Sequence, residues 1–308
     1  RFRSRTALDF DDAADSDDTV EMPLDSLSGG TGTIELWYYV TPSDSVQTIF
    51  KTGEVVKGLT LSILPNGDAK FQLGDEWQVQ RTLADLGGFD RWHHFAITWW
   101  YENDQLLASF LVDGIMRGAS VTPYVETGYT LFLGGTETSS TKAKGMIDDV
   151  RIWSTGRSYR EIQDAMFRTL TGAEQYLVGY YDCDGEGKSG LLRDRTAYKR
   201  HGTLINMTEI AWVLSTAPLG DAGRLVNTQT PLTLGESGSN LAVTITQGGQ
   251  GGANDYLGGY VYGDSAAMVI DDEEFPAGIN GRRDIVWGMA EFGTVTADLV
   301  IEYSGIAP

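Results

Sequence analysis

Residues 145–153 read GMIDDVRIW, and two stretches of the same character are GTIELW at 32–37 and RWHHFAITW at 91–99. All three are short, contain many β-branched and aromatic residues, and largely alternate between apolar and polar side chains. Successive side chains of a strand point to opposite faces, so this period of two is typical of strands with one face against a core. These stretches therefore predict antiparallel β-sheets.

The same pattern continues outward from these three stretches. Further strands are predicted at 33–40, 59–64, 70–73, 105–112 and 129–133. Hairpin turns are predicted at PNGD (65–68) and VDG (112–114), where Asn, Asp and Gly tolerate the required backbone angles. The one helical pattern covers 158–170, where Ser158 and Glu161 have the spacing of a capping box. The chain is thus predicted to be all-β with a single helix.

The length of 308 residues suggests two domains. A Pro-containing stretch at 214–219 marks a boundary, and the composition changes there: residues 220–308 contain no Lys and three Arg against twelve Asp and Glu. We expect a first domain at 1–215 and a second, smaller β-sandwich domain at 216–308. Because the sequence begins at Arg1 without Met or a leader, it is interpreted as part of a longer polypeptide.

The formal net charge of −20 argues against nucleic acid as a partner, because binding phosphates requires Lys and Arg. It disfavours anionic membrane surfaces for the same reason. No apolar run of the length needed to cross a bilayer occurs, so no membrane insertion is expected. The excess of carboxylates suits divalent cations or a merely acidic surface.

The predicted strands occur in the order found in the laminin-G-like and pentraxin-like jelly roll of the concanavalin A-like lectins and glucanases. The segments that carry the resemblance are ALDFD (7–11), DDTVE (17–21), GTIELW (32–37), TIFK (48–51), RWHHFAITW (91–99), LVDG (111–114), LFLGG (131–135), GMIDDVRIW (145–153) and the helix at 158–170. The resemblance covers about residues 5–215. It implies a two-sheet antiparallel jelly-roll sandwich in a secreted or cell-surface protein. Residues 278–283 and 298–305 resemble C-terminal β-domains of large bacterial surface proteins.

In such a sandwich, Trp37, Trp92 and Trp153 are interpreted as core anchors rather than as platforms on which sugars stack. Cys183 is the only cysteine, which excludes an intramolecular disulfide. We interpret it as a small hydrophobic residue in a strand, because no basic neighbour activates its thiol.

Calcium is the possible cofactor. The loop DDAADSDD at 11–18 holds five Asp, and Ca²⁺ takes six to eight oxygen ligands. Asp11, Asp17 and Asp18, joined by Asp148 of the IDDV motif, are the candidate ligands. The alternative is a solvated acidic loop. Calcium of the pentraxin type is disfavoured, because KTGEVVK at 51–57 lacks that family's Asp-Asn pair.

No catalytic site is predicted, and the protein is not expected to be an enzyme. His93 and His94 are adjacent in a strand and point to opposite faces, so they cannot easily share a zinc ion. Glycosidases need two carboxylates flanking the scissile bond. The only Glu-x-Asp, formed by Glu102 and Asp104, is followed by Leu107 where a laminarinase-type motif has Glu, and it falls in a predicted hairpin turn.

The favoured function is non-catalytic binding of a carbohydrate or another surface ligand, with a glycan or an extracellular or cell-surface protein as the partner. Trp77, Trp100 and Tyr101 are the candidate ligand-binding residues, because they lie near strand ends and sugar faces stack on aromatic rings. The first alternative is a structural adhesin or stalk spacer with no ligand of its own. The second is an enzyme whose site is not recognised.

We predict that millimolar calcium raises the melting temperature of residues 1–215 by several degrees and that magnesium does so less, because it prefers a smaller octahedral site. The combined Asp17→Asn and Asp148→Asn change is expected to remove this increment without unfolding the domain. Melting curves that coincide in calcium and in EDTA would show that the loop is a solvated acidic turn and not a calcium site.

Overall fold

The computed structural model describes residues 6–10, 18–24, 27, 30–53, 58–74, 77–83, 88–103, 105–122, 128–136, 140–185, 190–207, 211–220, 222–227, 232–235, 241–247, 256–262, 286–292 and 297–303. Contacts between Cα atoms divide these residues into two units. One unit contains 6–162 and 170–217, and the other contains 163–169 and the described residues from 218 onward. Each is described by itself below.

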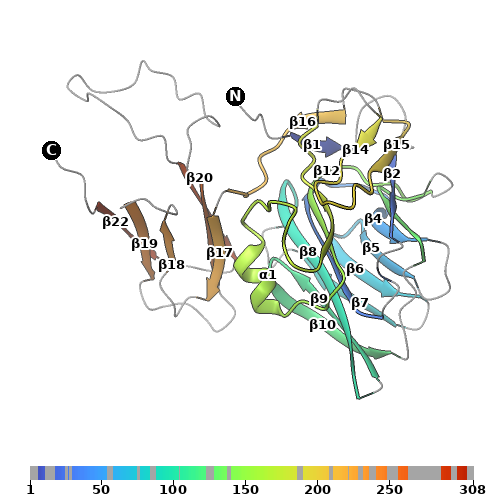
Figure 1. Cartoon of the computed structure of the whole chain (residues 1–308), viewed down its shortest axis with the longest axis horizontal. Helices are drawn as coiled ribbons and strands as arrows, with labels where there is room; N and C mark the ends of the chain where they lie inside the picture. The colour runs from blue at the N-terminus through green and yellow to red at the C-terminus, as the bar shows by residue number, and fades with distance from the viewer. Residues whose placement is uncertain are drawn as a thin grey trace. The chain divides into compact units, whose positions relative to one another are not determined.

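The first unit is a sandwich of two antiparallel sheets, which confirms the predicted jelly-roll architecture (Figure 1). Sheet A contains, in spatial order, β10 (Ile115–Thr122), β9 (Gln105–Val112), β8 (Arg91–Glu102), β3 (Gly32–Val40), β12 (Met146–Trp153), β1 (Thr6–Asp9) and β16 (Trp212–Leu214), and β13 (Leu177–Tyr181) also pairs with β12. Sheet B contains β14 (Leu191–Leu192), β15 (Gly202–Ile205), β2 (Thr19–Pro23), β11 (Thr130–Leu133), β4 (Gln47–Thr52), β5 (Leu59–Ile63), β6 (Asp68–Leu73) and β7 (Trp77–Thr82).

The core between the sheets follows from the period of two. Along β3, the side chains of Ile34, Leu36 and Tyr38 belong to the main apolar cluster together with Leu61 and Phe71 of sheet B. The intervening side chains of β3 point to the opposite face of sheet A. Because that second face is also buried over most of β3, the strand is closed to solvent on both sides.

The buried tryptophans lie in two different layers. Trp37, Trp92 and Trp153 are at most 7% exposed, which confirms that they are buried. They are not part of the cluster between the sheets, however, where the tryptophan is Trp99. Their positions as core anchors of the sandwich must therefore be corrected: they belong to a second layer on the outer face of sheet A.

The one helix among the described residues, α1 (Tyr159–Ala165), begins with the predicted capping box. The Ser158 amide donates to Glu161 Oε2 at 2.8 Å, and the Glu161 amide donates to Ser158 Oγ at 3.3 Å. The helix is shorter than the predicted 158–170. After Ala165 the chain turns away, and Thr169 donates its amide to Gly220 O at 2.8 Å in a short β-bridge.

The hairpin between β9 and β10 turns at Asp113 and Gly114, as predicted, and both have positive φ angles, of 52° and 71°. This two-residue turn matches the twist of the flanking strands. The buried Asp113 carboxylate also accepts the His94 amide at 2.8 Å and lies 2.7 Å from His93 Nδ1. The second ring nitrogen of His93 lies 2.8 Å from the carbonyl oxygen of Gly88. Carboxylate and carbonyl oxygens only accept, so both ring nitrogens of His93 carry protons.

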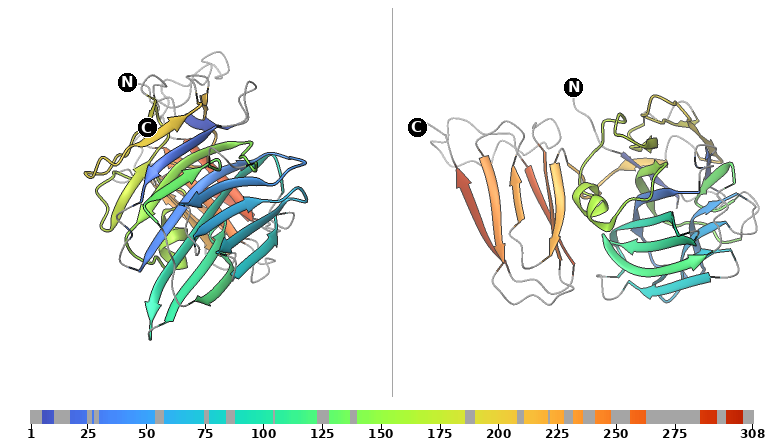
Figure 2. Two further views of the ribbon diagram at one scale, coloured as in Figure 1. Left: turned by 90° about the vertical axis from the view of Figure 1, so that its right-hand side faces the viewer. Right: turned by 60° about the horizontal axis from the view of Figure 1, so that its bottom comes forward.

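The second unit contains two three-stranded antiparallel sheets, as expected for a small β-sandwich (Figure 2). One has the order β17 (Ala222–Asn227), β20 (Tyr256–Tyr262) and β21 (Val286–Phe292), and the other β18 (Leu232–Gly235), β19 (Leu241–Gln247) and β22 (Ala297–Tyr303). Within the described part of the chain, no helix has the length and apolarity needed to span a membrane.

The His93–Asp113 pair predicts a pH dependence of stability. Burial disfavours the imidazolium, but the charge of Asp113 and the hydrogen bonds to Asp113 and Gly88 outweigh this and raise the pKa of His93 above its ordinary value. The pair therefore contributes fully to the free energy of unfolding below about pH 6.5, the ordinary histidine pKa, and this contribution is lost as pH rises through the raised pKa.

Asp113→Asn keeps a residue that tolerates the positive φ but removes the charge. We expect the variant to be less stable by about 3 kcal/mol at pH 5.5 and the deficit to shrink toward pH 9, measured by urea unfolding. A deficit that is constant or grows with pH would contradict the imidazolium assignment.

Candidate ligand-binding site

The outer face of sheet A carries side chains in rows that cross the strands. One row contains Thr33 of β3, Thr98 of β8 and Ser109 of β9, which are direct partners in the strand register. Because these positions alternate with the core residues, their side chains all project outward. The neighbouring row runs from Glu35 through Ala96 and Leu111 to Met116.

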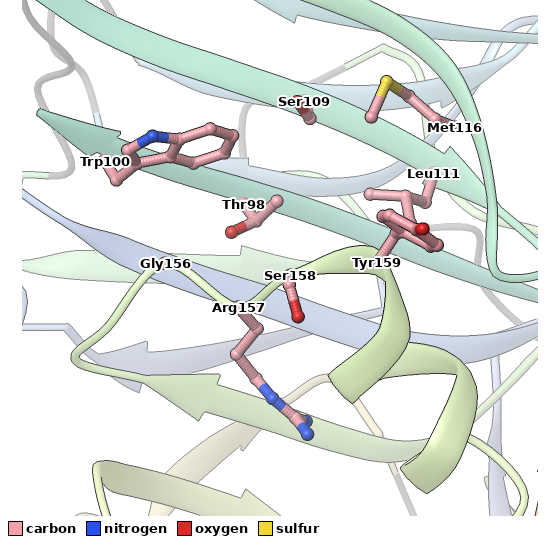
Figure 3. Close-up of a pocket in the computed structure, with 9 residues that line it drawn as sticks. All are labelled: Thr98, Trp100, Ser109, Leu111, Met116, Gly156, Arg157, Ser158 and Tyr159. Atoms are coloured by element: carbon pink, nitrogen blue, oxygen red, sulfur yellow. The ribbon is translucent and has the colours of Figure 1, made fainter. Parts of the chain in front are cut away.

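A pocket with a volume of about 340 Å³ lies on this face. Its lining comes from β8, β9, the start of β10 and the segment that leads into α1 (Figure 3). The lining residues are Thr98, Trp100, Ser109, Leu111, Met116, Gly156, Arg157, Ser158 and Tyr159. The volume is at the lower end of the roughly 300–1,000 Å³ typical of small-molecule sites.

The floor of the pocket is rigid because the sheet provides it. Ile162 of α1 packs against Ala96 and Leu111, which fixes the helix over the second row. Gly156 lets the preceding loop approach β8 closely, since a Cβ there would be 2.8 Å from the Trp99 carbonyl oxygen. The pocket is thus the space between the strands and the segment at 156–159.

The position of that segment depends on a buried carboxylate. Glu35 is fully buried, and its Oε1 accepts hydrogen bonds from Trp153 Nε1 at 2.7 Å and Arg157 Nη1 at 2.8 Å. His94 Nε2 lies 3.4 Å from Oε2, and Arg151 Nη1 lies 3.9 Å from Oε1. A buried charge is tolerated only when it is paired and hydrogen-bonded, and Glu35 meets both conditions.

Arg157 connects this carboxylate to the pocket wall. Its amide donates to Thr33 Oγ1 at 2.9 Å, and its Nη2 donates to the Glu161 carbonyl oxygen at 2.7 Å. Its guanidinium lies 4.1 Å from the centre of the Trp153 ring. Figure 3 shows the Arg157 side chain pointing away from the other lining residues. Arg157 therefore anchors the wall while its charge is directed out of the pocket.

The electrostatics of Glu35 follow from these neighbours. Burial raises the pKa of a carboxyl group, but Arg157, His94 and Arg151 more than offset this and hold the pKa of Glu35 well below its ordinary value. Glu35 therefore stays ionised throughout the neutral range and contributes stability that is lost only in strong acid.

The three candidate ligand-binding aromatics are not brought together. Trp100 lines the pocket. Tyr101 is its neighbour on β8, so it points to the opposite face, where its ring lies against Gly30. Trp77 begins β7 at the edge of sheet B, and its side chain lies outside the described residues. Sequence reasoning missed Tyr159, for which the only signal is its position directly after the helix cap.

The candidate calcium ligands are only partly described, because Asp11 and Asp17 lie outside the described residues. Asp18 is buried next to β2, and Asp148 is buried in β12, where Ser215 Oγ donates to its Oδ2 at 2.5 Å. β1 pairs Leu8 with Ile147 and Asp9 with Met146, so Asp148 lies toward the start of β1, away from the end at which the acidic loop leaves. No group of three or more metal-ligating side chains occurs among the residues that the structure covers. Calcium binding stays a prediction.

Two further expectations concern single residues. Glu102 pairs with Gln105 across a two-residue turn, which confirms that the Glu-x-Asp sequence lies in a hairpin. Cys183 is buried, but it has a φ of 48° and follows β13, so its placement inside a strand was wrong. Burial and the nearby carboxylates of Asp148 and Asp182 raise the pKa of its thiol, which makes it an inert group.

A family model described as the concanavalin A-like lectin/glucanases superfamily, Laminin_G_3, matches residues 14–163. Residues 14–163 thus resemble the laminin-G-like domains of this superfamily, and the unit made of 6–162 and 170–217 is called the laminin-G-like domain below. The match takes in β2 to β12 and ends within α1, so it includes every described residue that lines the pocket. No curated protein matches the chain significantly by sequence.

Several solved structures are similar to this chain. A Bacteroides ovatus protein inferred to bind carbohydrate has 20% identity and a TM-score of 0.53, over 70% of this chain and 62% of that one. A heptameric SAP-like pentraxin from Limulus polyphemus has 10% identity and a TM-score of 0.40, over 53% and 82%. The CBM40 of the Ruminococcus gnavus IT-sialidase, bound to α2,3 sialyllactose, has 15% identity and a TM-score of 0.38, over 50% and 93%. The chain thus spans less than two thirds of the Bacteroides protein.

Replacement of Glu35 by Gln is predicted to destabilise the laminin-G-like domain by about 3–5 kcal/mol, because it leaves the buried Arg157 charge without its partner. Urea unfolding measures this change. Glu21→Gln, an exposed position on β2 of sheet B, is the matched control and should change stability by less than about 0.5 kcal/mol. If the two substitutions change the free energy of unfolding equally, the Glu35 network is not needed for the stability of the domain.

Proposed function

We propose that the laminin-G-like domain is a non-catalytic carbohydrate-binding module of an extracellular or cell-surface protein, and that the pocket beside α1 is its binding site. The observation that carries this proposal is a cavity with aromatic and apolar walls and two buried hydroxyls at its floor. Trp100 and Tyr159 supply the rings, and Thr98 and Ser109 supply the hydroxyls.

This chemistry fits a sugar better than most other small molecules. A sugar ring has apolar C–H faces that pack on aromatic side chains, and hydroxyls that both donate and accept hydrogen bonds. Tyr159 is 44% exposed although it is aromatic, and Met116 is 51% exposed beside it. Exposed apolar side chains around a concave site are typical of ligand-binding surfaces. The lectin-containing superfamily and the Bacteroides relative support the same class of ligand.

The alternative is a structural spacer without a ligand. A spacer needs the Glu35 network, which stabilises the fold, but it has no need for exposed aromatic and sulfur-containing side chains around a cavity. The pocket therefore favours binding over a purely structural role.

The test is a glycan array probed with the whole protein, with and without calcium, followed by titration of the glycans that bind. Tyr159→Ala and Trp100→Ala are expected to weaken binding by roughly tenfold or more, because buried aromatic contacts dominate the energy of such sites. Tyr129→Ala is the matched control: it removes an aromatic residue that is 80% exposed and lies outside the pocket.

If the pocket variants keep the melting temperature of the unsubstituted protein, their loss of affinity comes from the site and not from unfolding. If Tyr129→Ala abolishes binding and the pocket variants do not weaken it, the binding site lies elsewhere on the domain. The absence of any bound glycan in either condition would favour the spacer.

A further inference from the structure

The hydroxyls on the pocket floor are held by a hydrogen-bonded chain that begins at Thr33. Thr33 Oγ1 accepts the Arg157 amide at 2.9 Å and donates to the Thr155 carbonyl oxygen at 2.9 Å. Thr33 also donates to Thr98 Oγ1 at 3.1 Å, so its one proton is shared between these two acceptors.

Thr98 Oγ1 therefore accepts from Thr33, which leaves its own proton and a second lone pair for a ligand. Thr98 is only 2% exposed, so this capacity cannot be met well by bulk water.

Ser109 supplies the second hydroxyl. It lines the pocket and is 4% exposed, and no hydrogen bond ties its hydroxyl to another described residue. Its proton and lone pairs are therefore available to a ligand. Thr98 and Ser109 are direct cross-strand partners, which sets their Cβ atoms about 4.5–5.5 Å apart. One ligand hydroxyl between them can hydrogen-bond to both.

The rest of the lining is largely apolar. Leu111, Met116 and the rings of Trp100 and Tyr159 provide carbon and sulfur surface, and the Tyr159 hydroxyl accepts Arg160 Nε at 3.1 Å. The Ser158 hydroxyl lies 2.7 Å from Glu161 Oε2 and donates to it. The one charged side chain in the described lining, Arg157, points away and is paired with Glu35. A ligand carboxylate would thus lose its hydration without gaining a charged partner, at a large energetic cost.

We infer that the pocket takes a single uncharged sugar residue that carries a methyl group, as a 6-deoxyhexose or an N-acetylhexosamine does. One sugar hydroxyl bridges Thr98 and Ser109, and the methyl group packs against Leu111 and Met116. This inference rests on the proposed carbohydrate-binding function and specifies the sugar class for the same site.

Isothermal titration of the whole protein with free monosaccharides tests the inference. The probes are fucose and N-acetylglucosamine, which carry a methyl group, glucose, which lacks one, and N-acetylneuraminic acid (sialic acid), which has one but is charged. At least one of the first two should bind tenfold or more tightly than glucose and sialic acid, and the stronger of the pair identifies the source of the methyl group.

Three substitutions separate the contacts. Thr98→Val keeps the shape of the side chain and removes its hydroxyl, and Ser109→Ala removes the second hydroxyl. Each is expected to weaken binding by about tenfold, since loss of one partner leaves a ligand group unsatisfied. Met116→Ala should reduce the ratio between the affinity for the methyl-bearing sugar and the affinity for glucose. Ser62→Ala is the matched control, because Ser62 is a buried serine (5% exposed) on sheet B.

Binding to sialic acid or glucose that equals or exceeds binding to both methyl-bearing sugars would overturn the inference and leave the proposed function intact. Thr98→Val and Ser109→Ala variants with unchanged affinity would do the same. If no sugar of any kind binds, on the array or in titration, the proposed function itself fails.

Discussion

The ionised carboxylate of Glu35, buried on the outer face of sheet A, is the constraint on which the rest of this face depends. Its position in β3 is fixed by the alternation of the strand, which directs Ile34 and Leu36 into the core and Glu35 outward. A buried charge must be compensated, and Trp153 and Arg157 do so through hydrogen bonds. The segment at 154–158 thereby follows a path that the carboxylate determines, and α1 begins where that path ends.

The consequence is a protein with two buried layers rather than one. The layer between the sheets is apolar and holds the sandwich together. The layer outside sheet A mixes tryptophan rings with ion pairs, including Arg151 with Asp149 at the bulge of β12. Where this outer layer ends, between Trp100 and Tyr159, the sheet is left uncovered and the pocket forms. The proposed binding site thus lies on strands of sheet A and on the segment that leads into α1.

The period of two located seven strands of the sandwich, β3, β5, β6, β8, β9, β11 and β12, and β12 lies within the predicted stretch at 145–153. β7 was missed because Val79 is its one residue in the core cluster, and β10 because the bulge between Met116 and Gly118 interrupts its alternation. Buried tryptophans were predicted, but local sequence could not distinguish the two faces of β3, since both are buried. Of the site, only Trp100 was predicted; Thr98, Ser109 and Tyr159 meet through strand register and the Arg157 anchor, which no local pattern encodes.

The most direct test of this account is a crystal structure of the whole protein grown with the methyl-bearing sugar that binds most tightly. The account predicts the sugar between Trp100 and Tyr159, with one hydroxyl within hydrogen-bonding distance of both Thr98 Oγ1 and Ser109 Oγ, and with Arg157 still paired with Glu35. A sugar bound on another face of the sandwich, or an Arg157 side chain turned into the pocket to contact it, would contradict the account.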